Sequence, residues 1–599
     1  MNSPVCPVDR RDCRLALLLA VLALIVYNAN FRLIAAGDTY TARFIPFALW
    51  GHGTVYLDSV REATAQRHPN PYWILPARHG HVASLYPVAT PLLVVPLYAP
   101  AVLYLHWAGW SYDNLSRVGA LMEKAAASCV ASLAVLLMFL LLRRRLDRRD
   151  ALLLTAAFAF ATETWAVSAQ ALWQHGPAEV AVIAALCFIT AEPSRRNALA
   201  AGLATGLLAA IRPPDVLLAA GLSVYALFWA RARAVHFALA AAVPVLLVLA
   251  YNATTFGRLG GGYGVIGAGS VSFFNKPLLP GVAGLLVSPG RGLFVFSPFL
   301  LFLPVLFHRS LRDREHRLLT VLLALSVALL IVLYARTDWR AGLSYGPRYL
   351  TDAVPILIWM LAPVLASLGR PARAVFLAGC LFAAWVQAVG AFLFTGTSFV
   401  FQYTPPPGPG EMANVWVARA APFLLEARNP RQPLELLRVA WSLGRPVPPM
   451  PPRPPLPGYP RRVARQEPPR VSRPSDFYTV SPCLLVDTRN GGPLGWGAAP
   501  RTYSVTGGAC ALPASAVAVV GEAQFLAGSE PGSVLLFPEG TGRSPLELSF
   551  GRSPQTLSFI LPLSPGGGGV LAVTTTSPSA HLALEVVGYF APERAPRAP

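Results

Sequence analysis

The stretch LALLLAVLALIVYNANFRLI, residues 15–34, decides the fold of this chain. It is apolar and long enough to cross a lipid bilayer as a single helix. Arg10, Arg11 and Arg14 precede it, and a basic flank of this kind keeps the N-terminus in the cytoplasm. Because no small-residue cleavage site follows a short apolar core, we interpret the stretch as a permanent anchor and not as a removed signal peptide.

The composition extends this interpretation to the whole chain. Of its 599 residues, 54% are hydrophobic and only 13% are charged, and the mean hydropathy is +0.49, which is typical of a polytopic membrane protein. The net charge of +20 comes from arginines at the ends of hydrophobic segments, so it indicates topology and no nucleic-acid partner. The arginine clusters lie at residues 143–149, 195–196, 231–233, 309–317 and 370–373.

Apolar segments between these clusters predict eleven crossings from a cytoplasmic start, which leaves the chain outside after Phe394. The predicted spans are residues 15–34, 119–142, 151–167, 177–192, 197–211, 214–230, 236–252, 293–308, 318–335, 350–368 and 374–394. The apolar stretch 89–107 contains Pro91, Pro96 and Pro100, and we expect it to lie in or dip into the outer interface. A cytoplasmic tail, 1–13, therefore precedes a transmembrane domain, 14–403, with a large first outer loop, 35–118.

The composition changes sharply after the last predicted span. Residues 404–475 are rich in proline, which favours an extended, semi-rigid linker. The linker arginines either rest on anionic headgroups or are simply solvated. Residues 476–592 alternate between short apolar runs and Gly or Pro turns, which predicts an all-β sandwich before a tail, 593–599. The predicted strands are 477–480, 483–486, 502–505, 516–526, 533–537, 546–550, 557–561, 569–574 and 581–587.

Cysteine usage favours an external position for the β-domain. Of the seven cysteines, Cys483 and Cys510 alone lie beyond the predicted membrane domain, and they can pair in an oxidising compartment. The others fall in the cytoplasmic tail or inside predicted spans: Cys6, Cys13, Cys129, Cys187 and Cys380.

The C-terminal segment resembles a domain that recurs in secreted bacterial proteins. It carries SPC at 481–483, VDTR at 486–489, CALPA at 510–514 and EVVGYF at 585–590. These motifs are similar to the pattern PCR-x-x-DTR, C-x-(I/L)-P and D-V-x-G-Y-F. Glu585 stands where that pattern has Asp, which weakens the case for a metal site. The resemblance implies an extracellular β-domain, and binding to carbohydrate or cell wall is a hypothesis for it.

Polar and aromatic residues collect in the predicted outer loops, whereas the cytoplasmic loops are short and basic. Because polar groups at a membrane face are costly and seldom persist without a use, we expect chemistry on the outer side. Asp38 follows the first span directly. A carboxylate there can act as a base on a hydroxyl while a lipid-borne substrate lies in the adjacent leaflet. The alternative is a solvated or helix-capping aspartate.

The order of motifs in residues 15 to about 394 resembles the GT-C class of polyprenyl-phosphate-sugar-dependent glycosyltransferases, such as protein O-mannosyltransferases and bacterial aminoarabinose transferases of lipid A. The motifs are GD at 37–38, YPVATPL at 86–92, SPGRGLF at 288–294 and YGPRYL at 345–350. Many relatives have two adjacent acids after the first span, but here Thr39 follows Asp38. Asp58 or Glu163 could supply the second acid.

The resemblance implies transfer of a sugar from a polyprenyl-phosphate donor to a hydroxyl of a glycan, lipid or protein, at the outer face of a bacterial plasma membrane. Asp38 would be the base, and the Arg348 guanidinium would bind the donor phosphate bidentately. An arginine that snorkels to headgroups is the alternative for Arg348. Arg291 and Lys276 are further phosphate-binding candidates. The remaining candidates, for acceptor binding or support of the site, are Arg43, Asp58, Glu163, His175 and Tyr345.

The sequence contains no Walker loop, no dinucleotide fingerprint and no Cys/His metal cluster, so we expect no metal and no cofactor besides the donor. A lipid or solute transporter, or a scaffold that presents the external β-domain, is the alternative function. Transporters tend to show related halves with charges at mid-membrane, and we find no internal repeat. An O-antigen-ligase-like enzyme is a further option, although such enzymes concentrate basic residues in one large late outer loop.

Overall fold

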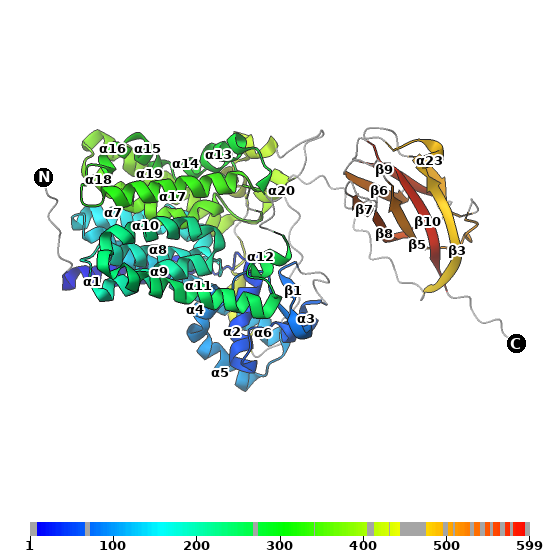
Figure 1. The fold of residues 1–599 in the computed structure, drawn as a ribbon, viewed down its shortest axis with the longest axis horizontal. Helices are drawn as coiled ribbons and strands as arrows, with labels where there is room; N and C mark the ends of the chain where they lie inside the picture. Colours follow the sequence, from blue (N-terminus) through cyan, green and yellow to red (C-terminus); the bar gives the residue numbers. More distant parts are fainter. Residues whose placement is uncertain are drawn as a thin grey trace. The chain divides into compact units, whose positions relative to one another are not determined.

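The computed structural model describes residues 9–65, 72–267, 274–340, 342–403, 413–429, 432–443, 475–494, 501–506, 510–526, 532–538, 546–550, 555–563, 570–575 and 579–592. The chain forms two compact units, Met1–Arg453 and Pro454–Pro599. The first unit is helical apart from a small hairpin, and the second is a β-sandwich (Figure 1).

The long helices of the first unit lie side by side, and α2, α3 and α5 gather at one end of them (Figure 1). The first helix, α1 (Arg10–Asn28), packs along α6 (Tyr112–Arg143). Next to α6 lies α8 (His175–Ile189), followed by α9 (Arg195–Ile211) and α11 (Ala234–Phe256). The other α-helices before the strap described below are α2 (Gly37–His52), α3 (Asp58–Ala65), α4 (Ala89–Val94), α5 (Ala99–Ala108), α7 (Arg148–Phe160), α10 (Val216–Ala230), α12 (Gly261–Val265), α13 (Leu278–Val287), α14 (Leu293–Phe296), α15 (Phe302–Val305), α16 (Phe307–Ser310), α17 (Arg317–Ala335), α18 (Val354–Ala366), α19 (Arg370–Leu393) and α20 (Thr397–Tyr403).

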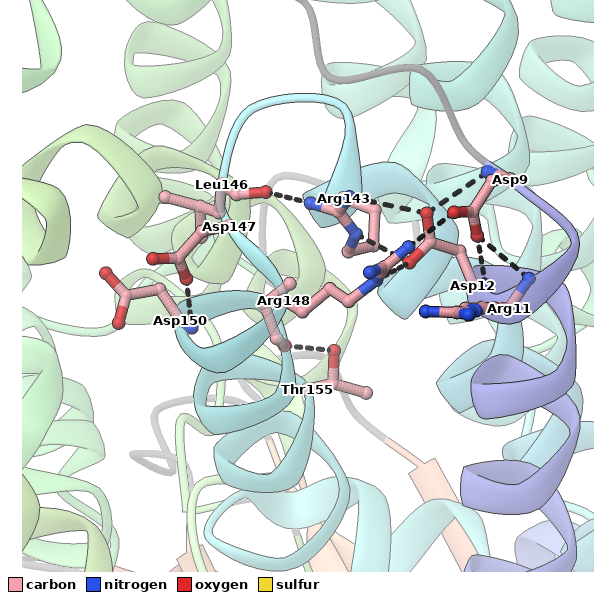
Figure 2. Close-up of polar contacts among 10 residues, drawn as sticks. Asp9, Arg11, Asp12, Arg143, Leu146, Asp147, Arg148, Asp150 and Thr155 are labelled. Atoms are coloured by element: carbon pink, nitrogen blue, oxygen red, sulfur yellow. Dashed lines mark hydrogen bonds and ion pairs between the residues drawn. The ribbon is translucent and has the colours of Figure 1, made fainter.

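An ionic cluster ties the start of α1 to the turn between α6 and α7 (Figure 2). The α1 N-terminus has a capping box, in which Asp9 and Asp12 each accept a backbone N–H of the other. The buried carboxylate of Asp12 also accepts hydrogen bonds from Arg143 Nε at 2.9 Å and Arg148 Nε at 2.8 Å. These arginines belong to the first predicted cytoplasmic cluster, so part of the charge that indicates topology also holds helices together.

Within the described residues, six helical segments are long and apolar enough to cross a membrane: Ala89–Ala108, Tyr112–Arg143, Pro213–Phe256, Arg317–Ala335, Arg348–Ala366 and Arg370–Leu393. The count of eleven crossings stays a prediction. Two predicted spans, 214–230 and 236–252, fall in Pro213–Phe256, where Arg231 has a φ of 47° and separates α10 from α11. Ala89–Ala108 meets the same criteria but is broken at the 3-10 turn η2 (Val95–Tyr98), which contains Pro96.

The predicted span 293–308 is not one continuous helix. It consists of α14, the 3-10 turn η7 (Pro298–Leu301), α15 and α16. Proline lacks a backbone N–H and its ring clashes with the preceding turn, so Pro298 and Pro304 explain the interruptions.

The first part of the predicted linker is folded against the helical unit. Residues 413–429 and 432–443, here called the strap, contain η9 (Ala413–Trp416), η10 (Ala418–Ala420), α21 (Pro422–Glu426) and α22 (Glu435–Trp441). The buried carboxylate of Glu426 accepts hydrogen bonds from the backbone and hydroxyl groups of Thr395 and Ser398 and from Asn429. Leu436 N donates to Phe31 O at 2.9 Å, which joins the strap to the segment after α1.

The second unit confirms the predicted β-sandwich. Its two four-stranded antiparallel sheets have the orders β3-β10-β5-β8 and β4-β9-β6-β7. The strands are β3 (Ser475–Asp487), β4 (Arg501–Ser504), β5 (Ala518–Phe525), β6 (Gly532–Pro538), β7 (Leu546–Phe550), β8 (Gln555–Pro562), β9 (Val570–Thr575) and β10 (Leu582–Pro592). The predicted pairing of Cys483 with Cys510 is also confirmed. Alternate residues such as Val519, Ala523 and Phe525 of β5 point into the shared core.

Candidate functional site

Asp38 lies in the first turn of α2, just after the chain leaves α1. Its Oδ1 accepts hydrogen bonds from Tyr72 Oη at 3.0 Å and Tyr86 Oη at 2.7 Å, and its Oδ2 accepts one from Arg348 Nη1 at 2.6 Å. A Cβ on Gly37 would lie 2.4 Å from Tyr72 Oη, so a larger residue there would displace the phenol that donates to Asp38. The structure therefore brings together two candidate residues that are 310 positions apart in the sequence.

Arg348 begins the 3-10 turn η8 (Arg348–Ala353), which leads into α18. Its guanidinium carbon lies 4.4 Å from the centroid of the Trp173 ring, an arrangement that favours a cation through the ring quadrupole. Only 8% of its side chain is exposed, compared with 27% for Asp38. The ion pair thus lies at the edge of the helical unit, partly accessible from one side.

Arg291 holds the loop that presents Arg348. Its Nη1 donates to the carbonyl oxygens of Ser344 at 2.6 Å and Gly346 at 3.1 Å, and its Nη2 donates to Gly342 O at 2.9 Å. Gly346 has a φ of +66°, so the backbone turns there in a conformation that glycine adopts at little cost. These contacts make Arg291 a support for the loop.

The neighbours of Asp38 keep its carboxylate ionised. Burial raises the pKa of Asp38, but the charge of Arg348 and the hydrogen bonds from Tyr86, Arg348 and Tyr72 outweigh burial, and the net pKa is lowered. Burial and the Asp38 charge raise the pKa of Tyr72 to about 12 and that of Tyr86 further. Both phenols therefore stay protonated at neutral pH and can donate.

A second buried polar network lies beside the ion pair. His175 Nδ1 lies 2.9 Å from Asp352 Oδ1, and Asp352 Oδ2 pairs with Arg212. The Arg348 and Arg212 guanidinium carbons lie 5.6 and 6.0 Å from the centroid of the same Tyr349 ring. Sequence reasoning found His175 but missed Arg212 and Asp352. Arg212 had a usable signal, because it lies between two predicted spans on the side opposite the arginine clusters.

The remaining candidate site residues make contacts away from the Asp38–Arg348 pair. Arg43 Nε pairs with Glu123 at 2.6 Å and ties α2 to α6. Asp58 accepts from the Val82 backbone at 2.8 Å and pairs with His81. The other three are placed as follows: Glu163 is buried and accepts from Gln387 Nε2 at 3.1 Å, Tyr345 is buried and donates to Val386 O at 2.7 Å, and Lys276 is exposed in the loop before α13.

Glu163 lies close to the loop that carries Arg348, because a Cβ on Gly346 would be 3.5 Å from its Oε1. The contacts of Asp58 place it at the hairpin β1–β2, formed by Ile74–Pro76 and Val82–Ser84. Among the described residues, no group of three or more His, Cys, Asp or Glu side chains could hold a metal ion.

One cavity borders Asp38, and a second is lined by part of the turn that follows Arg348. A small pocket of about 10 Å³ borders Asp38 and contains space for about one water molecule. An apolar cavity of about 370 Å³ is lined by residues from α13 to α18, and Leu350, two residues after Arg348, is one of them.

No family model and no curated protein matches this chain. Among solved structures it is similar to arabinofuranosyltransferase AftD from mycobacteria, with 11% identity and a TM-score of 0.36, over 98% of this chain and 59% of that one. It is also similar to arabinosyltransferase EmbB from Mycobacterium smegmatis, with 13% identity and a TM-score of 0.33, over 96% of this chain and 64% of that one. The chain thus spans about three-fifths of the length of these proteins, and scores this low carry no conclusion about its function.

Proposed function

We propose that this protein is a membrane glycosyltransferase of the GT-C type, which transfers a sugar from a polyprenyl-phosphate donor to an acceptor hydroxyl at the outer face of the plasma membrane. The observation that supports this function best is the contact between Asp38 and Arg348. It puts a carboxylate base and a phosphate-binding cation 2.6 Å apart, directly after the first apolar helix.

The reaction needs a base, a cation and no redox step. Asp38 takes the proton of the acceptor hydroxyl as its oxygen attacks the anomeric carbon, so that an O–H bond breaks and a glycosidic C–O bond forms. The bond from the anomeric carbon to the phosphate oxygen breaks, and the polyprenyl phosphate leaves with the electron pair. Attack from the opposite side inverts the anomeric centre. Arg348 balances the charge on the departing phosphate.

Both carboxylate oxygens of Asp38 accept hydrogen bonds, and Oδ2 accepts the one from Arg348. A donor phosphate would compete with Asp38 for Arg348 and would release Oδ2, the oxygen that accepts the proton. Donor binding therefore precedes acceptor activation in this proposal. The apolar cavity that Leu350 lines would receive part of the lipid chain.

The supporting roles follow from the contacts. Arg291 fixes the loop that ends at Arg348. Lys276, which is exposed in the loop before α13, remains a second phosphate-binding candidate. The charge of Arg212 is already balanced by Asp352, so we assign this pair to support. Asp352 would orient His175 through Nδ1, as carboxylates orient imidazoles in other active sites.

The test uses the full chain in lipid nanodiscs with labelled polyprenyl-phosphate pentoses and hexoses. Wild-type protein should release polyprenyl phosphate and transfer the label. Asp38→Asn should reduce transfer by roughly 10²–10⁴-fold while donor binding persists, because the variant lacks a base. Arg348→Lys should weaken donor binding, since lysine lacks the bidentate fork.

Asp147→Asn is the matched control, because asparagine also caps a helix and Asp147 caps α7 at the cluster drawn in Figure 2. It should keep wild-type transfer. Asp38→Asn with full transfer would remove the base assignment. Wild-type protein that turns over no donor in the panel would contradict the proposed function and favour a transporter or scaffold.

A further inference from the structure

Tyr72 combines a direct contact with the proposed base and a high exposure. Its Oη donates to Asp38 Oδ1 at 3.0 Å, yet 55% of the residue is exposed. The hydroxyl end of the ring therefore touches the carboxylate, while much of the aromatic surface is accessible to a ligand. An aromatic side chain with one polar end and an apolar body is suited to a ligand that is itself part polar and part apolar.

The hairpin β1–β2 holds Tyr72 in place. The backbone carbonyl of Trp73, the next residue, accepts the Leu85 N–H at 2.9 Å and continues the pairing of the two strands. Ser84 Oγ in β2 donates to Thr41 Oγ1 in α2 at 2.8 Å, which ties the hairpin to the helix that carries Asp38. The rings of Tyr72 and Trp73 meet at an interplanar angle of 80°, with their centroids 5.0 Å apart. A ring held in this way costs a ligand little ordering entropy.

The two oxygens of Asp38 divide the site into two sides. Oδ2 accepts from Arg348, the proposed phosphate-binding cation, whose guanidinium carbon lies 4.4 Å from the centroid of the Trp173 ring. Oδ1 accepts from Tyr72 and from Tyr86, and Tyr86 is the less exposed of the two phenols. With the donor phosphate on the Arg348 side, the Tyr72 side of the carboxylate is left for the acceptor.

We propose that the Tyr72 ring is a platform for a sugar residue of the acceptor, so that the acceptor is a carbohydrate; this rests on the proposed glycosyl transfer. A sugar ring has a face of apolar C–H groups and a rim of hydroxyl groups. When it packs face to face on Tyr72, its rim lies beside the phenol Oη and therefore beside the carboxylate that takes the proton. The apolar face leaves water, and the hydroxyl groups stay near polar partners.

The two other acceptor classes lack this combination. A serine of a protein carries its hydroxyl on one CH₂ group next to a polar backbone, and a lipid hydroxyl belongs to a headgroup that has no apolar ring face. Either hydroxyl can reach Asp38, but neither ligand covers an aromatic ring and presents a hydroxyl at the edge of that ring. Tyr72 thus contacts and positions the acceptor, and Asp38 remains the base.

Two substitutions separate the Tyr72 ring from its hydroxyl. Tyr72→Phe removes only the hydroxyl, whereas Tyr72→Leu removes the hydroxyl and the ring. Trp107→Leu is the matched control for the loss of an exposed ring, because Trp107 is 81% exposed and belongs to the same predicted outer loop but lies near the end of α5.

The first measurement needs no donor. Saturation-transfer NMR on the full chain in nanodiscs uses methyl disaccharides of hexoses and pentoses, a serine peptide and glycerol. Wild-type protein should transfer saturation to the ring C–H groups of at least one disaccharide and should leave the peptide and glycerol unsaturated. Tyr72→Leu should lose this signal, and Tyr72→Phe and Trp107→Leu should keep it.

The second measurement is transfer from the donor identified above. Tyr72→Leu should raise the KM for the disaccharide by roughly two- to tenfold relative to Tyr72→Phe, the effect of one stacked ring, with an unchanged KM for the donor. Tyr72→Phe should keep the acceptor KM of wild type. Its acidic limb of kcat/KM should move to higher pH, because the bond from Tyr72 lowers the pKa of Asp38 and is lost in this variant.

Equal disaccharide binding by wild type and Tyr72→Leu, or no binding of any disaccharide, would overturn the inference. Transfer to the peptide or to glycerol that is as efficient as transfer to every disaccharide would also overturn it. The proposed function survives these results if Asp38→Asn still reduces transfer. Disaccharide binding that depends on Tyr72, without turnover of any donor, would remove the proposed function and keep the sugar platform.

Discussion

At the scale of single residues, the charge state of Asp38 is the property that the site controls most closely. Burial alone would favour the protonated acid, but Arg348 and two phenols stabilise the carboxylate, and the pKa is lowered from the usual value of 3.8. A group whose pKa is lower in the folded state than in the unfolded state stabilises the fold above its unfolded pKa. That contribution disappears as the pH falls through the lowered value.

This linkage predicts how the stability of wild-type protein and Asp38→Asn will differ with pH. The difference between their unfolding midpoints should stay constant from pH 8 to about pH 4 and should shrink below that, because wild-type Asp38 then becomes protonated. Thermal unfolding of the full chain in detergent between pH 3 and pH 8 measures it. A difference that already disappears near pH 6 would indicate a raised pKa and would contradict the ion pair.

The sequence identified Asp38 and Arg348 because each lies at the end of an apolar segment in a recognisable order of motifs. It did not identify the phenols of Tyr72 and Tyr86 as partners of Asp38, since loop conformation brings them there. The pair of Arg212 with Asp352 was missed for a related reason. Their contact joins residues 140 positions apart, and neither residue belongs to a sequence motif that indicates the other as its partner.

At the scale of helices, the backbones of α9 and α11 approach each other closely at two glycines. A Cβ on Gly202 would lie 2.2 Å from Phe237 O, and one on Gly206 would lie 2.0 Å from Ala241 O. Both obstacles are backbone atoms, so they cannot move as side chains do. The spacing of Gly202 and Gly206 is that of a GxxxG motif, in which small residues let two helix backbones approach.

Gly206→Ala should therefore separate α9 from α11 and destabilise the helical unit by roughly 1–3 kcal/mol, as overpacking does elsewhere. The unfolding midpoint of the full chain in detergent should fall. Gly369→Ala is the control, because a Cβ there meets nothing within 4 Å and Gly369 has no positive φ. A Gly206→Ala variant as stable as Gly369→Ala would show that the two helices can separate at no cost.

Helix positions were predictable where an apolar run contains no proline. They were not predictable where prolines interrupt the helix and turn the chain. The predicted span 318–335 corresponds closely to α17, which contains no proline. Residues 293–308 have the same hydropathy signal but turn at Pro298 and Pro304. Residues 404–475 as a whole are rich in proline, which predicts a linker, whereas the strap within them contains only Pro422 and Pro433. Its attachment includes Glu426, a single buried carboxylate with five hydrogen bonds, which hydropathy and composition do not indicate.

At the scale of the whole molecule, the arrangement of arginines makes a prediction about sidedness. If the N-terminus is cytoplasmic and the number of crossings is odd, the β-sandwich lies outside. Green fluorescent protein fused after Pro599 should then be dark, because it does not mature after export in an unfolded state. The same protein fused before Met1 should fluoresce. A bright C-terminal fusion would place the β-sandwich in the cytoplasm and contradict the topology.

The disulfide gives a second prediction at this scale. Cys483 and Cys510 are separated by 27 positions, and closing such a loop in the unfolded chain contributes about 3–4 kcal/mol on the chain-entropy model. Reductant should therefore lower the urea midpoint of residues 454–599, a unit with its own core. The double variant Cys483→Ala, Cys510→Ala should unfold at the urea midpoint of the reduced wild-type unit, and reductant should not change the midpoint of this variant. Equal midpoints with and without reductant would show that the bond contributes nothing.

The β-sandwich was the most predictable part of the molecule. Alternation of apolar and polar residues indicates the strand and its inward face together, and the predicted strand 546–550 is identical to β7. The runs 477–480 and 483–486 were predicted as separate strands because Ser481 and Pro482 lie between them. They form one strand, β3, because pairing with β10 continues past two register shifts that absorb the irregularity.

The separation of Asp38 and Arg348 also has a consequence during synthesis. A ribosome that adds 5–20 residues per second needs about 15–60 s to travel the 310 positions between them. For that time the nascent chain has its aspartate in place but not the arginine that neutralises it. A chain that has not yet reached Arg348 therefore lacks the ion pair on which the proposed function rests.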